Sequence, residues 1–561
     1  MSERIFIGVA WPYANGPLHM GHIAGCYLAA DIFARYHRLK GNKVLMVSGS
    51  DAHGTPNTVR AAEEGVSPES IVERYHASFL KTWEQLGISW DLYTSTHTEN
   101  HTQVTQDVFL RLLERGHLYK DTMSLPFCPQ ESRFLPDRYV LGTCSRCGSH
   151  SARGDQCDAC GHPLEPFDLL EPHCRFCGTT PVPKDSEHFF LRLSGFTDQL
   201  YAWVKEQSHW RINVRNFTLR YLEDGLHDRA ITRDMDWGIP VPLEGYDGKR
   251  FYVWFENIIG YLSASKEWAR RRGEPEAWRD FWEGNKALAY YFIGKDNIFF
   301  HTISWPAEIL GYEGLNLPYN VPANEFMTLE GKKISTSHNY AVWVPDYLER
   351  YDPDPLRYYL SATMPETSDS DFSWHDFVRR NNDELVATYG NLVHRVLTFT
   401  YPNFDGRIPQ PGDLDQASQD FLARASQLFQ DVDHSLGLCH FRNALSSAMS
   451  LAQEANRYLE AKEPWKTLKE DLPGTATTLW VVLSVINCLK TALHPFLPFS
   501  SEKLHGMLGF ADTISERGWG WEASPDALPP GQSMSAPEPL FSKLEEEVAA
   551  AELERLGQAI G

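Results

Sequence analysis

The stretch Arg4-Ile-Phe-Ile-Gly-Val-Ala-Trp11 decides the fold, because it is an apolar strand candidate that runs into the turn Pro12-Tyr-Ala-Asn-Gly-Pro17. A helix-like run follows over residues 22–37, and Lys43-Val-Leu-Met-Val-Ser-Gly49 is a second strand candidate. Strand, helix and strand at this spacing predict a βαβ unit and hence a parallel sheet. Ligands bind to such sheets where the strands end, so we expect the chemistry in the segments that follow the two strands.

A second α/β segment follows an insertion. Residues 119–190 are rich in turn residues, prolines and paired cysteines, whereas residues 250–255 and 287–293 again look like apolar strands. After about residue 385 the strand signals vanish and apolar residues recur at helical spacing. The predicted fold class is α/β: a Rossmann-type parallel-sheet catalytic domain split by a zinc-knuckle insertion and followed by a C-terminal α-helical bundle.

Composition excludes several classes of protein. The chain has 561 residues, of which 42% are hydrophobic and 22% charged, so disorder and fibrous repeats are excluded. Lys and Arg number 52 against 74 Asp and Glu, giving a net charge of -22, which excludes a general nucleic-acid coat but not a local groove for one RNA. The most apolar segment, residues 479–486, is far shorter than the ~20 residues of a bilayer span. We expect a soluble, cytoplasmic protein with no membrane partner.

Two polar motifs are weak signals when each is taken alone. His19-Met20-Gly21-His22 places two imidazoles at a strand-to-helix turn, where a helix N-terminus favours polyphosphate, although a surface pair or a lone metal site has the same pattern. Gly331-Lys-Lys-Ile-Ser-Thr-Ser337 is a basic loop, which alone would be an ordinary solvated turn.

Together the two motifs resemble the HIGH and KMSKS signatures of class I aminoacyl-tRNA synthetases, and the chain as a whole resembles the methionyl-tRNA synthetase family. Further motifs carry this resemblance in family order: Trp11-Pro-Tyr-Ala-Asn-Gly-Pro17, Ser50-Asp-Ala-His-Gly-Thr-Pro56, Leu135-Pro-Asp-Arg-Tyr139, Glu187-His-Phe-Phe190, Phe251-Tyr-Val-Trp254, Phe292-Ile-Gly-Lys-Asp296 and Pro464-Trp465. The resemblance implies methionyl-adenylate formation from L-methionine and ATP, and transfer of the methionyl group to initiator and elongator tRNA(Met). It also implies catalytic roles for His19, His22 and Lys333, with Mg²⁺ accompanying ATP.

The resemblance assigns the remaining substrate contacts residue by residue. ATP is expected at Asn15, Gly21, Gly294, Asp296, Lys332 and Thr336. Methionine is expected at Trp11, Tyr13, Asp51, Trp254, Asn257, Tyr261 and His301, with Arg233 as a possible substrate contact. Aromatic walls suit a polarizable thioether, and a carboxylate can pair with the substrate ammonium. Three residues depart from the family pattern: Trp11 stands for a common Leu, Asn257 for Ala, and Thr336 for the second lysine of the loop.

The cysteines predict one metal site and leave a second open. Cys144, Cys147, Cys157 and Cys160 form two Cys-x-x-Cys pairs, the ligand set of a tetrahedral structural Zn²⁺ in a reducing compartment. A possible second knuckle combines Cys128, Glu131, Cys174 and Cys177. In relatives with two zinc ions a cysteine stands where this chain has Glu131, so a three-cysteine-plus-carboxylate site and a metal-free knuckle are both open.

For RNA, Asn391 and Arg395 lie one helical turn apart, and Trp465 follows Pro464 at a helix start. In the family these positions read the CAU anticodon, the tryptophan stacking on an unpaired base; helix capping and core packing would explain them otherwise. The chain has no appended C-terminal dimerisation module, so we expect a monomer.

The resemblance divides the chain into five expected regions: 1–118 and 241–325 as the two catalytic halves, 119–240 as the connective insertion, 326–385 as a stem-contact segment with the KMSKS-like loop, and 386–561 as the anticodon-binding bundle. Asn257 and Thr336 motivate one alternative, a class I paralogue for another amino acid or acceptor. The other is a catalytically retired, zinc-containing RNA-binding protein, against which His19, His22, Asp51, Asp296 and Lys333 argue.

Overall fold

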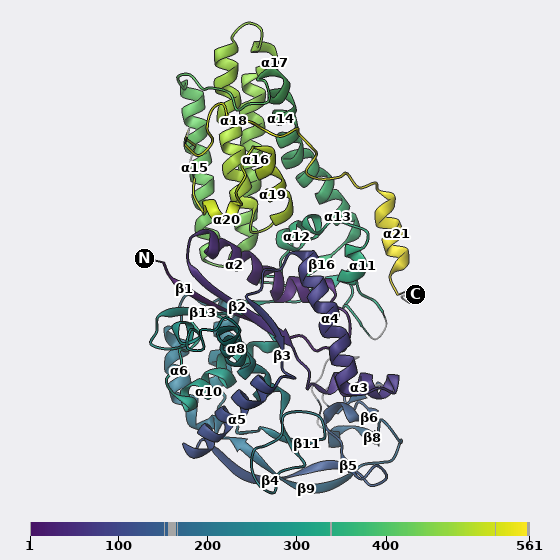
Figure 1. Ribbon diagram of the computed structural model, residues 1–561. Helices are drawn as coiled ribbons and strands as arrows, with labels where there is room; N and C mark the ends of the chain where they lie inside the picture. The colour runs from purple at the N-terminus through teal and green to yellow at the C-terminus, as the bar shows by residue number, and fades with distance from the viewer. Residues whose placement is uncertain are drawn as a thin grey trace.

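The chain is arranged along one long axis, with a helical bundle at one end, the insertion at the other and a parallel sheet between them (Figure 1). This computed structural model describes residues 2–150, 152–154, 157, 164, 166–336, 339–521, 523–524 and 526–557.

A five-stranded parallel sheet lies at the centre, in the order β14–β13–β1–β2–β3. Its strands are β1 (Arg4–Val9), β2 (Lys43–Ser50), β3 (Leu92–Ser95), β13 (Ala287–Gly294) and β14 (Ala323–Asn324). All four pairings are parallel, so the predicted βαβ unit is confirmed. Because β1 lies between β2 and β13, it joins the two catalytic halves across the insertion.

Both faces of the sheet are covered, since alternate residues of β1 enter different cores. Ile5, Ile7 and Val9 pack into the core that continues into the helical bundle. Phe6 packs into the core on the other face, which includes residues of α8 (Val253–Arg271). Buried parallel strands of this kind are apolar on both faces, which is why the strands stand out as uninterrupted apolar runs in the sequence.

One helical run leaves the turn after β1, formed by α1 (Met20–His22), a π-helical turn (Ile23–Tyr27) and α2 (Leu28–Leu39). The other helices of this half are α3 (Thr55–Glu64), α4 (Pro68–Leu86), α5 (Glu99–Glu114), α8, α9 (Arg279–Trp282) and α10 (Trp305–Tyr312). The predicted strand over 250–255 is only partly correct, because β12 (Lys249–Phe251) is short and α8 begins at Val253. The buried residues of α8 recur at helical spacing over a longer stretch, and that pattern outweighs a short apolar run.

The insertion consists of small antiparallel sheets, in the orders β10–β9–β4–β5 and β7–β6–β8, and the pair β11–β12. Their strands are β4 (Leu118–Cys128), β5 (Arg133–Phe134), β6 (Val140–Thr143), β7 (Ala152–Arg153), β8 (Leu170–Cys174), β9 (Val182–Leu191), β10 (Arg229–Ala230) and β11 (Thr232–Asp234). Helices α6 (Thr197–Glu206) and α7 (Ile212–Glu223) follow. The three-stranded sheet carries the cysteine pairs and has its own small core.

Helices dominate the rest of the chain after the short parallel pair β15 (Met327–Leu329) and β16 (Ser370–Phe372). They are α11 (Val344–Leu348), α12 (Pro353–Ala362), α13 (Trp374–Arg380), a π-helical segment (Asn381–Gly390), α14 (Asn391–Asn403), α15 (Gln416–Gly437), α16 (Phe441–Lys462), α17 (Pro464–Thr467), α18 (Leu472–Leu493), α19 (Pro498–Met507), α20 (Ile514–Arg517) and α21 (Glu547–Arg555). Helix α18 is apolar and long enough to cross a membrane, but 78% of its most apolar window is buried. It is the core helix of the predicted bundle, which is confirmed.

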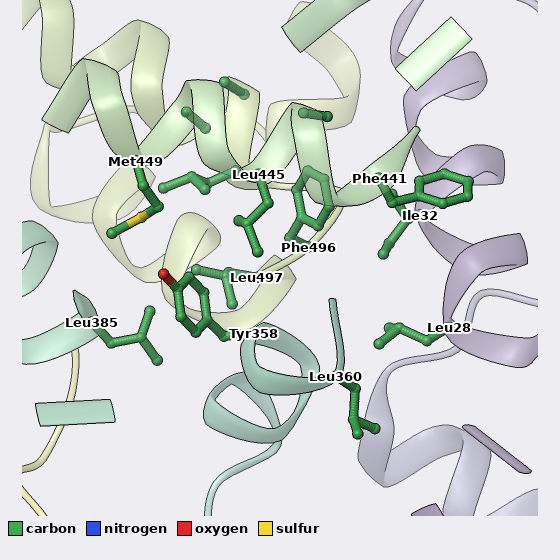
Figure 2. Close-up of a cluster of buried hydrophobic side chains, with 14 of the residues drawn as sticks. Leu28, Ile32, Tyr358, Leu360, Leu385, Phe441, Leu445, Met449, Phe496 and Leu497 are labelled. Atoms are coloured by element: carbon green, nitrogen blue, oxygen red, sulfur yellow. The ribbon is translucent and has the colours of Figure 1, made fainter. Parts of the chain in front are cut away.

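The bundle and the catalytic half share one hydrophobic core. Figure 2 shows side chains of α2, α12 and α16 converging there, among them Leu28, Ile32, Leu360 and Phe441. The junction is therefore packed like a domain interior, and the bundle is held against the helix that follows the histidine motif.

Helix α21 returns from the bundle to the catalytic half and lies beside α11 and α13 (Figure 1). The Glu552 carboxylate accepts hydrogen bonds from the Arg350 guanidinium (2.9 and 2.8 Å) and the Tyr351 hydroxyl (2.8 Å). Just beyond the helix, the Gly557 N–H donates to the Asn339 carbonyl (3.2 Å). The final helix thus supports the segment that follows the basic loop.

Candidate functional site

The segments that follow β1 and β2 meet at the carboxyl edge of the sheet, as the sequence predicts. The Asp51 N–H donates to the Pro12 carbonyl (2.8 Å), and the Ala14 N–H donates to the Asp51 carbonyl (3.1 Å). These bonds align Tyr13 with Asp51 beyond the ends of the strands. Two groups assigned to different parts of the methionine site therefore lie side by side.

His19 and His22 lie against each other at the start of α1, with ring centroids 3.8 Å apart. The His19 N–H donates to Nδ1 of His22 (3.1 Å). Burial lowers the pKa of His22 to about 4, and burial together with His22 lowers the pKa of His19 well below its usual value. Both imidazoles are neutral at pH 7, so they offer hydrogen bonds rather than positive charge to a phosphate. Nδ1 of His19 is buried and has no hydrogen-bond partner in the part of the chain described.

The basic loop lies directly against this turn. The Met20 N–H donates to the Val342 carbonyl (3.0 Å), and a Cβ at Gly21 would lie 3.0 Å from Cδ1 of Ile334. Lys332, Lys333 and Thr336 are all exposed on the loop; Ser337 of the motif is outside the described residues. The structure thus brings the two signature motifs together, with two exposed lysines on the loop beside the histidine turn.

The aromatic residues expected to form the amino-acid pocket come from three elements and pack against one another in pairs. Trp11 lies edge-on to Tyr261, with ring centroids 6.3 Å apart, and Tyr13 lies edge-on to Trp254 at 6.4 Å. The Tyr261 hydroxyl lies 2.7 Å from Nε2 of His301, whose Nδ1 lies 2.9 Å from the Asn297 carbonyl. Since a carbonyl only accepts, the imidazole N–H is on Nδ1, and Nε2 accepts from the tyrosine.

Two features of the expected pocket are a glycine that makes room for Trp11 and an uncharged histidine, His301. A Cβ at Gly260 would lie 2.8 Å from Cζ2 of Trp11, so the larger Trp in place of Leu requires glycine on α8. Burial lowers the pKa of His301 to about 4. The pocket therefore presents aromatic surface and one neutral imidazole, which suits an unbranched thioether.

Asp51 is held at both carboxylate oxygens. Oδ1 accepts from the N–H groups of His53 (3.1 Å) and Gly54 (3.2 Å), and Oδ2 accepts from the Asn257 amide (2.7 Å). Burial and the neighbouring Glu256 raise the pKa of Asp51 well above its usual value. An ammonium ion bound here would favour the ionised carboxylate. Asn257, a departure from the family pattern, is thus a direct partner of Asp51.

The sequence did not predict a buried cluster of one glutamate and two histidines that lies beside Asp51. Oε1 of Glu256 lies 3.1 Å from Nδ1 of His53, and its Oε2 lies 2.6 Å from Nε2 of His101. Burial alone would raise the pKa of Glu256, but the two histidines lower it. The available signal was His53 within the Ser50–Pro56 motif and Glu256 next to Trp254, but neither position indicated that the side chains meet.

The expected adenosine-binding residues lie at the ends of two strands, Gly294 and Asp296 at the end of β13 and Asn15 after β1. A Cβ at Gly294 would lie 2.8 Å from Oδ1 of Asp296, so a larger residue there would displace the aspartate. Burial raises the pKa of Asp296. Asp296 belongs to a short 3-10 turn rather than capping a long helix, and Asn15 lies half-buried in the turn after β1. These residues share the strand-end edge with the histidine motif.

Arg233 lies apart from the Asp51 pocket. Its guanidinium donates to the carbonyls of Ala230 (3.0 Å) and Thr232 (2.9 Å) and lies 4.1 Å from the Tyr252 ring centroid. It lines a cavity of about 470 Å³ between the insertion and α8. The stacked rings of Trp254 and Phe300, 4.2 Å apart, also line this cavity, so Arg233 is placed to contact whatever occupies it.

Two groups of cysteine sulfurs converge in the insertion. The Sγ atoms of Cys144, Cys147 and Cys157 all lie within 4.8 Å of one another, and Cys160, the fourth expected ligand, is outside the described residues. The Sγ atoms of Cys128, Cys174 and Cys177 form a second such group. Both arrangements fit a thiolate-bound metal.

Glu131 contributes to the second group in an unexpected way. Its N–H donates to Sγ of Cys128 (3.4 Å), whereas its exposed carboxylate is not among the atoms that converge. The Cys177 sulfur also lies 3.4 Å from the Thr179 hydroxyl. The second cluster is therefore a set of three sulfurs supported by hydrogen bonds.

The three expected anticodon readers lie near the far end of the bundle. Asn391 begins α14 and is exposed, and the Arg395 guanidinium on the same helix lies 5.5 Å from the ring centroid of Trp465 on α17. Trp465 is 42% exposed. Nε and Nη2 of Arg395 are buried with no hydrogen-bond partner among the described residues. A half-exposed indole beside an unsatisfied guanidinium can stack on and hydrogen-bond a nucleobase.

Two models of known protein families together match almost the whole chain. A family model described as tRNA synthetases class I (M) matches residues 5–397, and one described as the anticodon binding domain of methionyl tRNA ligase matches residues 408–559.

Individual proteins agree with these matches. The chain is 57% identical over 557 residues to the methionine–tRNA ligase of Dehalococcoides mccartyi, covering 99% of this chain and 100% of that protein. Identity to the methionine–tRNA ligase of Thermomicrobium roseum is 52% over 579 residues, covering 99% of each. The solved structure of Mycobacterium tuberculosis methionyl-tRNA synthetase in complex with methionyl-adenylate superimposes with a TM-score of 0.79 at 26% identity, covering 96% of this chain and 99% of that one.

Proposed function

Because this chain belongs to the methionyl-tRNA synthetase family, we propose that the site at the strand ends catalyses both steps of methionine–tRNA ligation. L-Methionine attacks the α-phosphate of ATP, giving methionyl-adenylate and pyrophosphate, and the methionyl group then passes to the 3′ end of tRNA(Met) with release of AMP. One observation carries this proposal: the histidine turn and the basic loop pack together at the same sheet edge as Asp51.

Each phosphate-contacting residue has a distinct task. His19 and His22, both neutral, hydrogen-bond phosphate oxygens, and Gly21 lets the ligand approach the helix N-terminus. The lysine Lys333 neutralises charge that develops on the triphosphate in the transition state, with Lys332 and Thr336 beside it. Adenylation needs positioning and charge neutralisation more than a protein nucleophile. Asn15, Gly294 and Asp296 hold the adenosine.

The amino-acid pocket separates charge from the apolar side chain. Asp51 pairs with the substrate ammonium, and Asn257 orients the carboxylate through its 2.7 Å hydrogen bond. The thioether lies among the aromatic residues of the pocket, which are Trp11, Tyr13, Trp254, Tyr261 and His301. Arg233 contacts substrate from the adjoining cavity.

Reading of tRNA(Met) takes place on the bundle. Asn391 and Arg395 contact anticodon bases, and Trp465 stacks on one of them. Since the bundle packs on α2, which continues the helical run of His22, correct seating of the anticodon end fixes the orientation of the acceptor end.

Metal requirements follow from the donor atoms. Zn²⁺ bound by Cys144, Cys147, Cys157 and Cys160 would stabilise the insertion, and Mg²⁺ would accompany ATP. For the second knuckle we propose that Cys128, Cys174 and Cys177 hold Zn²⁺ only weakly, because the Glu131 carboxylate does not converge with them. Reduced thiolates of this kind are kept in the cytoplasm, where we place the protein.

We further propose that one chain is the working unit, because catalytic site and anticodon readers both lie on it. The region boundaries expected from the sequence stand as the functional division: 1–118 and 241–325 for catalysis, 119–240 for the insertion, 326–385 for stem contact and 386–561 for the anticodon.

The test is ATP–pyrophosphate exchange screened against all common amino acids. Methionine is expected to support exchange far better than leucine, isoleucine, valine or cysteine. A different winner would indicate a paralogue for that amino acid, and no exchange with any amino acid would indicate a retired site.

A further inference from the structure

The cluster around Glu256 is a second buried charge beside the amino-acid site. The side chains of Glu256 and Asp51 are 0% and 2% exposed, and His53 and His101 are 5% and 1% exposed. Among the described residues neither carboxylate has a Lys or Arg partner. Buried carboxylates without cations are costly, so an ammonium bound beside Asp51 would offset that cost.

The two carboxylates are held by the same short segments of chain. His53 donates its backbone N–H to Oδ1 of Asp51 and places its side-chain Nδ1 3.1 Å from Oε1 of Glu256. On α8, the residue after Glu256 is Asn257, which donates to Oδ2 of Asp51. Glu256 therefore supports, through the His53 imidazole, the residue that binds Oδ1 of Asp51, and Oδ2 is bound by the next residue on the same helix.

The histidine side chains contact only one of the two carboxylates. His101 contacts Glu256 at 2.6 Å and is otherwise bonded to the Ser263 hydroxyl at 2.7 Å. His53 contacts Glu256 on one side and Nδ1 of His97 (3.3 Å) on the other. These imidazole contacts are made with Glu256, His97 and Ser263, and not with the Asp51 carboxylate. What remains for Asp51 is a cation delivered from the pocket.

We propose that Glu256 is a positioning residue for the amino-acid ammonium: it fixes Asp51 through His53 and adds a second negative charge behind it. This inference rests on the proposed role of Asp51. Because the ammonium is present in both the free amino acid and the adenylate, the effect is on binding in ground and transition states alike. Such an interaction changes KM with little change in kcat.

The experiment measures binding of two alcohols that differ only in the amine. L-Methioninol keeps the ammonium, and 4-(methylthio)butan-1-ol has the same chain without it. Titration calorimetry is carried out on wild type, Glu256→Gln and Glu256→Asp, with Glu267→Gln as the matched control on the same helix, where the carboxylate accepts from Thr94.

We expect Glu256→Gln to weaken methioninol binding at least tenfold, to leave 4-(methylthio)butan-1-ol within twofold, and to raise KM for methionine but not for ATP. Glu256→Asp should recover part of the loss, and Glu267→Gln should match wild type. Equal weakening of both alcohols would show that Glu256 only packs the core, and unchanged binding of both would show that it does nothing for the ammonium.

A second variant covers the case in which Glu256→Gln does not fold. His53→Gln removes the imidazole contact to Glu256 while keeping the backbone N–H to Asp51, and the same selective loss of methioninol is expected; an unchanged ratio between the alcohols overturns the proposal. Calorimetry needs no turnover, so this result is independent of the exchange assay that tests the proposed function.

Discussion

Arg357 and Asp31 form a fully buried ion pair, with Nη2 of the arginine 2.6 Å from Oδ2 of the aspartate. Asp31 lies on α2, further along the helical run that begins at Met20, and Arg357 lies on α12. The same guanidinium donates to the carbonyls of Pro495 and Phe496, both at 2.8 Å, where α18 leads into α19. One side chain therefore connects the histidine helix, the segment after the basic loop and the bundle.

Arg357→Leu is expected to lower the free energy of unfolding by about 3 kcal/mol, the low end of the cost of breaking a buried ion pair, because Arg35 stays paired with Asp31. Burial alone would raise the pKa of Asp31, but Arg35 and Arg357 hold it well below its usual range. A depressed carboxyl pKa stabilises the fold above the unfolded value of about 4 and loses that effect as the pH falls. In urea unfolding, the gap between wild type and variant should thus be largest near pH 7 and shrink in acid.

The control for that prediction is Arg379→Leu, which removes an exposed ion pair with Asp376 and should change stability little. If both variants unfold at the same urea concentration, the buried pair does not hold the three regions together.

Trp465→Ala should separate the two half-reactions. Pyrophosphate exchange should be nearly intact because α17, which carries Trp465, lies at the end of the bundle away from the sheet (Figure 1). Aminoacylation should fall by orders of magnitude, since base stacking contributes roughly 1–3 kcal/mol and also positions the acceptor end. Equal losses in the two assays would mean that Trp465 only supports Arg395 and the bundle.

Lys333→Ala should slow adenylate formation much more than it weakens ATP binding, because its charge acts in the transition state. Single-turnover kinetics with varied ATP measures both quantities. Thr336→Ala should do little, since a hydroxyl carries no charge, and Thr336→Lys should stay active. If Lys332→Ala is the crippling change and Lys333→Ala is nearly silent, the charge belongs to the neighbouring lysine.

Zinc content can be tested on reduced protein prepared without chelators. Metal analysis should give at least one Zn²⁺ per chain, and Cys147→Ser or Cys157→Ser should release it, because both sulfurs belong to the first group. At low zinc concentrations Cys177→Ser should lower the zinc content less than Cys147→Ser or Cys157→Ser does, because the weak second site is then mostly empty. A content near two in wild type that resists chelator would contradict the weak second site, and a zinc-free protein would contradict both.

Glu308 provides a pH test. This residue of α10 is 1% exposed, its Oε2 has no hydrogen-bond partner among the described residues, and burial raises its pKa well above the usual value. A carboxyl group whose pKa is higher in the folded than in the unfolded protein costs nothing while it is protonated in both states. As the pH rises above the unfolded pKa, it lowers the free energy of unfolding. Glu308→Met should therefore leave stability near pH 4 unchanged and increase it at pH 8, measured by denaturant unfolding. A destabilised variant at pH 8 would show that the carboxylate has a stabilising partner.

Local patterns were enough for the sheet, the insertion and the bundle, because a buried parallel strand is an apolar run between turn residues and a bundle helix repeats at its own period. The exception was residues 250–255, where a short apolar run belongs mostly to α8. The motifs also predicted two segments that the structure brings together, although their contact, Gly21 against Ile334, depends on how residues 18–20 pair with residues 342–344.

Contacts between distant residues could not be predicted in this way. Asn257 looked like a misfit in an apolar pocket, yet its amide is bonded to Asp51, and Glu256 drew no notice although it meets two histidines. Arg233, expected only as a possible substrate contact, lines a cavity together with Trp254, which the sequence did not indicate. Each depends on the geometry of α8 against loops from the other catalytic half.

The position of β1 between β2 and β13 has a consequence for biogenesis. Residues 51–286 are made after β1 and β2 and before β13, so the β13-facing edge of β1 is an apolar edge without a partner during that time. Unpaired edges of this kind invite association with other chains. Synthesis of this protein should therefore place an early demand on chaperones, greatest while the insertion is being translated and relieved once β13 adds to the sheet.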